Sequence, residues 1–273
     1  MELGLRDKRV LITGGSKGIG RQTALTMVQE GAEVALVART LATLESARQW
    51  IRDVVPDARV TVISADLTGE AAAQRAVDEA IRAMGGVDIL VNCAGAAPGR
   101  LLEEIDDETW AVALGLKFLG YVRMVKAVMP HFVERGGGVI VNVIGNDGVK
   151  PSFWELTGTA ANAAGLAAMQ ALADQYGRYG IRIVSVNPGP VDTGRWDTLT
   201  EAYARDMNLS VQEADRLAKS SIAFGRIATP QEVADVVTFL ASDRARFVHG
   251  TSLTIDGNQR KALMDVWQRP NHS

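Results

Sequence analysis

The sequence predicts an α/β protein with a doubly wound, parallel sheet of seven strands in a three-layer arrangement with helices on both faces. Short β-branched runs alternate with longer segments of helical periodicity, which is typical of βαβ units around a buried parallel sheet. No repeat, low-complexity tract or linker interrupts this alternation. We therefore expect a single domain over residues 1–273, wound by right-handed crossovers.

The strands are expected where apolar, β-branched residues run between turn residues. Their ranges are 9–13, 33–38, 59–64, 87–92, 138–143, 181–187 and 252–256. Helical periodicity predicts helices near 18–30, 41–53, 70–84, 107–134, 158–177 and 230–242. The one long insertion, 190–229, holds two weak helical patterns, which suit either a lid over a site or a surface excursion.

Composition sets limits on the partners and the compartment. The formal net charge of −3 gives no reason to expect nucleic acid or an anionic membrane surface as a partner. Cys93 is the only cysteine, so an internal disulfide is excluded and a reducing compartment is expected. No apolar run is long enough for a signal peptide or a membrane span. We expect a cytoplasmic protein with a small-molecule substrate.

The first predicted strand leads directly into a glycine-rich loop, Thr13-Gly-Gly-Ser-Lys-Gly-Ile-Gly20. Glycines at 14, 18 and 20 permit a tight turn and let the backbone approach a diphosphate at the start of the next helix. The spacing is G-x-x-x-G-x-G. Its position between a strand and a helix indicates a dinucleotide site.

The same loop also contains G-x-S-x-G, the nucleophile elbow of α/β-hydrolases, centred on Ser16. That interpretation requires an acid and a histidine later in the chain, and only His131, His249 and His272 are present. It is the weaker one, because nothing precedes the first strand to form the oxyanion side.

The second strand ends at Arg39, where an NAD site would carry an acidic residue for the ribose hydroxyls. An arginine there can pair with the 2′-phosphate of NADP, and Lys17 adds a second positive charge. The sequence therefore favours NADP over NAD. The alternative is that Arg39 is simply a solvated strand end.

Three further motifs, together with the glycine-rich loop, are typical of one protein family. They are Asn92-Cys-Ala-Gly95, Asn187-Pro-Gly-Pro-Val-Asp-Thr193, and the segment 225–242 before the last strand. With the glycine-rich loop, in this order, the chain resembles the short-chain dehydrogenase/reductase family over about residues 5–258, and its ketoacyl-reductase-like members most. The resemblance implies a Rossmann-type fold, a nicotinamide cofactor, and a dimer or tetramer.

The resemblance also implies roles for matching positions. Ser16, Lys17 and the loop residues Gly14, Gly18, Ile19 and Gly20 would hold the phosphates. Asp66 and Leu67 would meet the adenine, and Asn92, Ala94 and Gly95 would line the ribose. Pro188, Gly189, Val191 and Thr193 would face the nicotinamide. Cys93 replaces the usual second asparagine of its motif and is expected to be a small buried residue.

The family's usual catalytic residues are missing from the expected positions. A count back from Tyr179-Gly-Ile-Arg182 and Asn187-Pro-Gly189 puts the tyrosine position on Gly158 and the lysine position on Asn162. The serine position falls on Gly145 and the asparagine position on Lys117. An asparagine amide cannot titrate, so the usual proton relay is absent. Two glycines would also widen the pocket.

Lys117 is the sharpest candidate for a substitute acid, since burial can lower the pKa of a lysine toward neutrality. Asn162 is expected to hydrogen-bond the cofactor ribose or a water. Asp147, Lys150 and Glu155 are further candidates, but we expect each of them in a solvated loop. Filling of the pocket by Phe153 or Trp154 would count against catalysis.

Three functions remain open from the sequence. The first is an NADP(H)-dependent oxidoreductase, acting on an unknown carbonyl or alcohol through a non-standard proton relay. The second is a non-redox enzyme, such as a lyase or dehydratase, in the same pocket. The third is a pseudoenzyme that binds the dinucleotide and serves as a subunit or sensor. The cofactor motifs favour the first, and no metal site is expected.

Overall fold

A computed structural model describes residues 2–95 and 97–260. Its centre is a parallel sheet in the order β3-β2-β1-β4-β5-β6-β7. The strands are β1 (Arg9–Thr13), β2 (Glu33–Ala38), β3 (Val60–Ser64), β4 (Ile89–Asn92), β5 (Gly138–Val143), β6 (Ile181–Pro188) and β7 (Ser252–Ile255). The predicted doubly wound, seven-stranded fold is confirmed.

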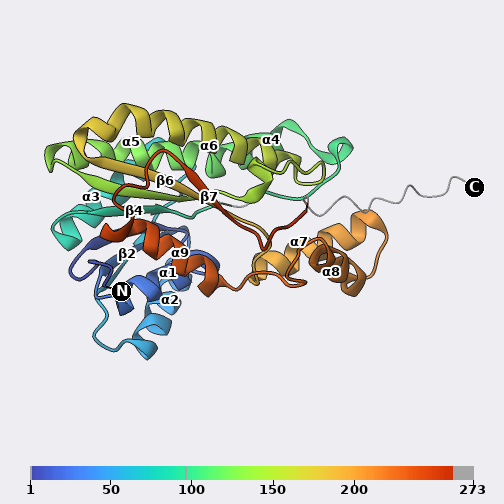
Figure 1. The fold of residues 1–273 in the computed structure, drawn as a ribbon, viewed down its shortest axis with the longest axis horizontal. Coiled ribbons are helices and arrows are strands. Elements are labelled where there is room, and N and C mark those ends of the chain that lie inside the picture. The colour runs from blue at the N-terminus through green and yellow to red at the C-terminus, as the bar shows by residue number, and fades with distance from the viewer. Residues whose placement is uncertain (1, 96, 261–273) are drawn as a thin grey trace, which may run out of the picture.

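Helices cover both faces of the sheet, as Figure 1 shows. One face carries α1 (Gly18–Gln29), α2 (Leu41–Val54) and α9 (Pro230–Ala241). The other carries α3 (Glu70–Met84), α4 (Asp107–Lys117), α5 (Leu119–Glu134) and α6 (Leu156–Tyr176). Helices α7 (Gly194–Met207) and α8 (Val211–Ser220) lie to one side of the layers, on the right in Figure 1.

Alternation along the strands separates two cores. In β1, Val10 and Ile12 belong to the core under α1, α2 and α9, whereas Leu11 faces the core under α3, α5 and α6. All three are fully buried. Burial on both faces explains why these strands read as continuous apolar runs in the sequence.

The predicted single helix over 107–134 is wrong in one respect, because the chain forms two helices that meet at Phe118. The ψ angle of Phe118 is −65° at φ −106°, outside the usual helical combination. Arg123 spans the break and donates from Nη1 to the carbonyl oxygen of Gly115 at 2.9 Å. Apolar periodicity continues through the break, so the sequence pattern does not reveal it.

The insertion after β6 packs against the loop before α6. Trp154, Trp196 and Tyr203 form its core with small residues of α7 and α8. The Trp154 indole nitrogen donates to Asp206 Oδ2 at 2.8 Å, and its ring meets Tyr203 edge-on. Trp154 thus anchors the two helices to the loop before α6. It does not fill the cavity described below.

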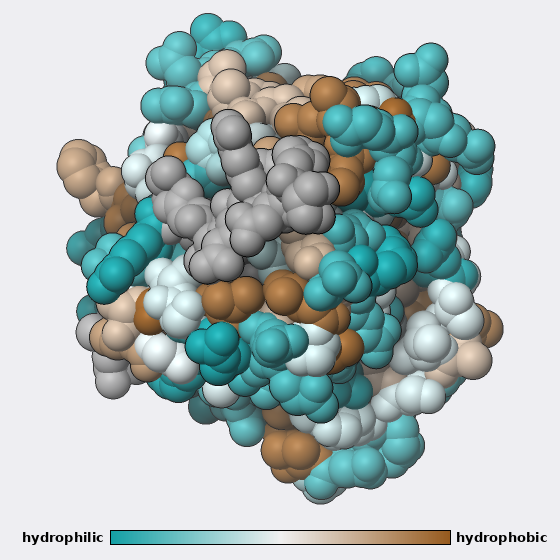
Figure 2. Space-filling model, turned by 90° about the vertical axis from the view of Figure 1, so that its right-hand side faces the viewer, coloured by the Kyte–Doolittle hydropathy of each residue, from teal (hydrophilic) through white to brown (hydrophobic). Residues whose placement is uncertain are grey.

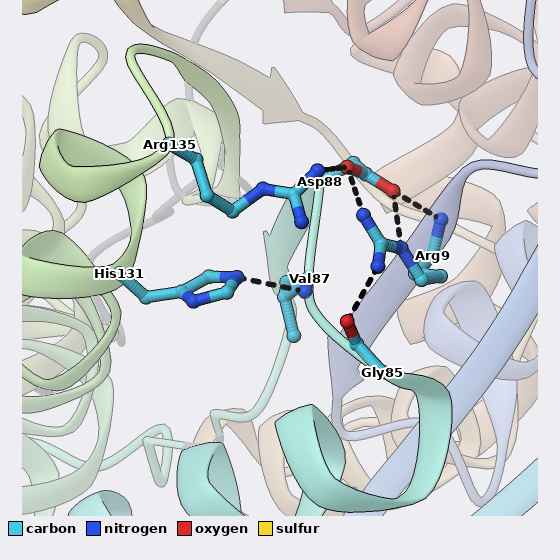
Figure 3. A network of polar contacts seen from close by, with 6 residues as sticks. All are labelled: Arg9, Gly85, Val87, Asp88, His131 and Arg135. Carbon is cyan, nitrogen blue, oxygen red and sulfur yellow. Dashed lines mark hydrogen bonds and ion pairs between the residues drawn. The ribbon is translucent and has the colours of Figure 1, made fainter.

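A polar network ties the strands at the amino end of the sheet (Figure 3). Arg9 binds both carboxylate oxygens of Asp88, through Nε at 2.8 Å and Nη2 at 2.7 Å. Arg135 also binds Asp88, at 2.8 Å, and His131 accepts a hydrogen bond from the Val87 amide. The network joins β1, the start of β4 and the end of α5.

Among the described residues, none of the helices combines the length and apolar character needed to span a membrane.

Candidate active site

A cavity of about 350 Å³ opens at the carboxyl end of the sheet. Strand order reverses between β1 and β4, and ligands of open α/β sheets bind at such a switch point. The lining combines the glycine-rich loop, the loops after β4, β5 and β6, and the starts of α6 and α7. The cavity therefore joins segments that are far apart in the sequence.

The glycine-rich loop is shaped by close backbone approaches. Gly14 has a φ of +69°, and a Cβ atom at this position would lie 2.8 Å from the carbonyl oxygen of Cys93. The hydroxyl of Thr13 accepts hydrogen bonds from the amides of Cys93 and Ala94, which ties the ends of β1 and β4 together. Glycine at position 14 is thus required by both conformation and space.

The start of α1 is open to an anion. Lys17 occupies the N-cap position with no side-chain hydrogen bond to the helix, and the first turn holds no acidic residue. The first amides of a helix have no partners within the helix and carry a partial positive charge. With Ser16, Gly18, Ile19 and Gly20 also lining the cavity, this end suits a phosphate group.

Four of the predicted cofactor residues lie outside the cavity lining. Arg39 and Asp66 are exposed at the carboxyl ends of β2 and β3. They are close enough that the Arg39 charge helps to lower the pKa of Asp66, after the larger effect of hydrogen bonds from Thr68. Leu67 and Asn92 are buried, and the Asn92 amide donates to Asn142 at 3.0 Å.

The other predicted cofactor residues line the cavity. Ala94 and Gly95 do so after β4, and Pro188, Gly189, Val191 and Thr193 do so after β6. Asn187 is fully buried at the end of β6, and the part of the chain that is described gives its side chain no hydrogen bond.

Lys117 enters the cavity from the end of α4. Its Nζ donates to the carbonyl oxygen of Ile144 at 2.9 Å. A Cβ atom on Gly95 would lie 3.1 Å from the Lys117 side chain, so the glycine leaves room for it. Burial lowers the pKa of Lys117, and the negative charge of Asp147 partly opposes this.

The expected widening beside Gly145 and Gly158 is wrong, because Asp147 takes that space. A Cβ atom would lie 2.9 Å from Asp147 Oδ1 at Gly145 and 2.9 Å from Oδ2 at Gly158. The Asn162 amide donates to Asp147 Oδ1, so its predicted hydrogen bond goes to a protein carboxylate. The carboxylate of Asp147 thus stands between positions 145, 158 and 162.

The expectation of a solvated loop is wrong for Asp147 and Glu155. Asp147 is 8% exposed, and both side chains line the cavity. Burial raises the pKa of Glu155 to about 7, and the charge of Asp147 adds to the shift. Lys150 is partly buried outside the lining, where it pairs with Asp256 and donates to the carbonyl oxygen of Gln259.

Arg195 brings a positive charge from the first turn of α7. Its Nη2 donates to the carbonyl oxygen of Ala97. Burial lowers its pKa, and the charges of Glu155 and Asp147 oppose this. The sequence analysis missed Arg195, although it stands two residues after the Asn187–Thr193 motif, within the expected lid.

The remaining protonated groups of the cavity are held in place. The Tyr121 hydroxyl donates to the carbonyl oxygen of Val143 at 2.7 Å, and burial raises its pKa well above the ordinary value. Burial also raises the pKa of Cys93 to about 12, so this thiol stays protonated and is not a reactive thiolate.

The hydrolase interpretation has no histidine to support it. His131 lies in the network at the opposite end of the sheet. His249 is bound to the Ile183 amide and the Ala173 carbonyl, outside the cavity lining. His272 lies outside the described residues.

The chain matches the short chain dehydrogenase family over residues 8–204. It belongs to that family. This short-chain dehydrogenase is 32% identical to short-chain reductase protein NovJ of Streptomyces niveus, over 93% of its own length and 94% of that protein's. It is 30% identical to 3-oxoacyl-[acyl-carrier-protein] reductase FabG of Thermotoga maritima, over 93% and 98%.

Solved structures agree with the fold of this short-chain dehydrogenase. L-sorbose reductase from Gluconobacter frateurii, complexed with NADPH and L-sorbose, superposes with a TM-score of 0.88 at 29% identity. The match covers 96% of this chain and all of the other. The resemblance predicted from the motifs is thus confirmed at the level of the family.

Proposed function

We propose that this protein is an NADP(H)-dependent oxidoreductase that interconverts a carbonyl and an alcohol on a small molecule. One observation carries the proposal. A single cavity joins the open start of α1, which suits a phosphate, to a cluster of titratable side chains, namely Lys117, Asp147 and Glu155. The relatives named as reductases, and the NADPH in the L-sorbose reductase structure, support the same chemistry.

The residues present fit a dinucleotide. The loop from Gly14 to Gly20 and the uncapped start of α1 would hold the diphosphate. Segments 94–95 and 188–193 would line the ribose and nicotinamide part. When bound, the nicotinamide supplies or accepts a hydride. The chain itself positions the substrate and moves the proton.

The proton relay of this proposal is non-standard. Gly145, Gly158, Asn162 and Lys117 stand where the family's serine, tyrosine, lysine and asparagine are expected. Lys117 belongs to the proposed relay, because it lines the cavity and the negative charge of Asp147 acts on its ammonium group. Asn162 positions the Asp147 carboxylate for this relay by donating a hydrogen bond to it.

A screen of carbonyl and alcohol substrates, following NADPH absorbance, tests the proposal together with calorimetry of cofactor binding. We expect tight NADPH binding and turnover of at least one small ketone or alcohol. Binding without turnover of any compound would favour the cofactor-binding pseudoenzyme. Absence of binding would overturn the proposal entirely.

The cofactor preference is tested at Arg39. We expect NADPH to bind at least about tenfold more tightly than NADH, because a guanidinium and a phosphate form strong, charge-assisted hydrogen bonds. The Arg39→Asp variant should erase or invert this ratio, as measured by calorimetry. Arg48→Asp is the matched control, since this residue lies on α2 with a partly exposed side chain outside the cavity lining. Equal affinities in the unmodified protein would contradict the preference.

A further inference from the structure

The position expected for the family's tyrosine lies beside the carboxylate of Asp147 and the side chain of Glu155. Beside Gly158, a Cβ atom would lie 2.9 Å from Asp147 Oδ2 and 3.9 Å from Glu155 Cβ. Both side chains line the cavity, from the loop after β5 and from the residue before α6. Two side chains that can carry a proton thus line the cavity near a position that is itself a glycine.

Hydrogen bonds hold Asp147 and the backbone of Glu155, whereas some of their carboxyl oxygens have no hydrogen-bond partner among the described residues. Asn162 donates to Asp147 Oδ1, and the amide of Glu155 is fixed by a hydrogen bond to Ser152 Oγ at 3.2 Å. Within 2–95 and 97–260, neither Asp147 Oδ2 nor the Glu155 carboxyl group has a hydrogen-bond partner. Both residues line the cavity, so their unpaired carboxyl oxygens are the groups that a substrate oxygen would meet.

The charge of Asp147 favours the protonated form of Glu155. Two carboxylates that share a buried site repel each other, so one of them keeps its proton to a higher pH. Burial is the main cause that raises the pKa of Glu155 to about 7, and the Asp147 charge adds to it. The positive charges of Arg195 and Lys117 lower the pKa of Glu155 and so limit its rise.

Other groups of the cavity are less suited to give a proton. The hydroxyl of Tyr121 donates its hydrogen bond to the Val143 carbonyl. The thiol of Cys93 holds its proton too strongly, because burial raises its pKa to about 12. The Lys117 ammonium is engaged with the Ile144 carbonyl. The carboxyl pair has no such engagement on its cavity side.

We propose that Glu155, with Asp147 beside it, carries the proton that the reaction exchanges with the substrate oxygen, in place of a tyrosine at position 158. In reduction, the carboxyl O–H bond breaks, and the proton goes to the carbonyl oxygen of the substrate. The pair gains one negative charge, and solvent then restores the proton. The hydride for the carbonyl carbon comes from the reduced nicotinamide, so this inference rests on the proposed function.

The first test does not depend on turnover. The cofactor-free protein, with ¹³C-labelled Asp and Glu carboxyl carbons, is titrated by NMR. We expect one carboxyl group to titrate near pH 7, to vanish in Glu155→Gln, and to titrate at a lower pH in Asp147→Asn. Glu201→Gln, on the exposed side of α7, is the control that leaves it in place. Ordinary titration of every carboxyl group, near pH 4, would overturn the inference.

The second test uses a substrate found in the screen. For reduction, kcat should fall above about pH 7, because the acid must be protonated. Glu155→Gln should lower kcat by roughly 10²–10⁴-fold, the usual range for a lost general acid, and remove this pH dependence. NADPH affinity should stay within about threefold. A variant that keeps the wild-type rate and pH profile would overturn the inference and leave the proposed oxidoreductase intact.

Discussion

At the scale of single residues, the glycines at 145 and 158 are explained by a neighbour rather than by an empty space. The carboxylate of Asp147 approaches both positions to within 2.9 Å of where a Cβ atom would stand. Gly145 also has a φ of +151°, which side chains rarely adopt. A serine and a tyrosine at these two positions are therefore incompatible with Asp147 as it lies here.

This contact predicts a coupling between two substitutions. Gly158→Ala should lose the stability that alanine normally gives a helix over glycine, because its Cβ would meet and displace Asp147 Oδ2. In an Asp147→Ala background the same change should cost about 1 kcal/mol less, as for residues in direct contact. Urea denaturation of the four proteins measures the cycle. Additive effects would contradict the contact.

The difference between sequence and structure is largest in the loop before α6. Asp147 and Glu155 lie among Gly, Lys, Pro and Ser residues, a composition that predicts a solvated loop. The loop instead runs back into the cavity, held by Trp154 in the core beside α7 and α8. Such a long-range contact leaves no periodic signal, so sequence reasoning could not assign the depth of these carboxyl groups.

At the scale of elements, the expected strands and helices end within two residues of the observed ones, and the main miss is the break in the helix over 107–134. The strands β1, β2 and β5 begin and end as expected. Short β-branched runs between turn residues are typical of buried strands. The break at Phe118 was not predicted, because the backbone angles change there and no proline stands at the break to indicate it.

We propose that α7 and α8 act as a lid hinged on Trp154. The Asp206 side chain is 3% exposed and accepts the hydrogen bond of the Trp154 indole nitrogen. Asp206→Ala would leave that buried donor unpaired, which is costly. We expect faster hydrogen exchange in 194–220 and little change in α9, as measured by mass spectrometry.

The matched control for the lid is Arg205→Ala. Arg205 also binds Asp206, but its own side chain is 67% exposed. Exposed ion pairs contribute little to stability, so this variant should exchange like the unmodified protein. Equal acceleration by both substitutions would argue that the ion pair, and not Trp154, holds the lid.

At the scale of the whole molecule, the two ends of the sheet have different tasks. The carboxyl end carries the cavity, and the amino end carries the network around Asp88 (Figure 3). Burial alone would raise the pKa of Asp88, but hydrogen bonds from Arg9 and the charges of Arg9 and Arg135 lower it overall. A carboxyl group whose pKa is lowered by folding stabilises the protein only while it is ionised.

Stability should therefore depend on pH through Asp88. Its contribution is complete above the unfolded pKa of about 3.9 and is lost as the pH falls through the lower folded pKa. We expect Asp88→Asn to reduce the free energy of unfolding at pH 6–7 and the difference to shrink below about pH 4. Asp7→Asn, which breaks an exposed pair with Arg59, should change stability by less than about 0.5 kcal/mol. A pH-independent difference for Asp88→Asn would contradict this role.

The last prediction concerns assembly, for which we propose a homodimer or homotetramer. On the long helices α5 and α6, the apolar residues Tyr121, Met124 and Met169 pack in the chain's own core and so do not contact a second copy. Figure 2 shows hydrophobic residues beside the grey atoms at one end of the molecule, with hydrophilic residues over much of the rest of that face. The edge strand β7 is the better candidate surface.

The first three residues of β7 are exposed, Leu253 is 48% exposed, and the nearby Phe247 is fully exposed. An edge strand of this kind offers unpaired backbone groups and apolar side chains to a second copy. Light scattering at micromolar concentration should give the mass of a dimer or tetramer, and Leu253→Glu should lower it. Val54→Glu, on the exposed end of α2, is the control. A monomer mass for the unmodified protein would reject the assembly, and an unchanged mass for Leu253→Glu would move the interface away from β7.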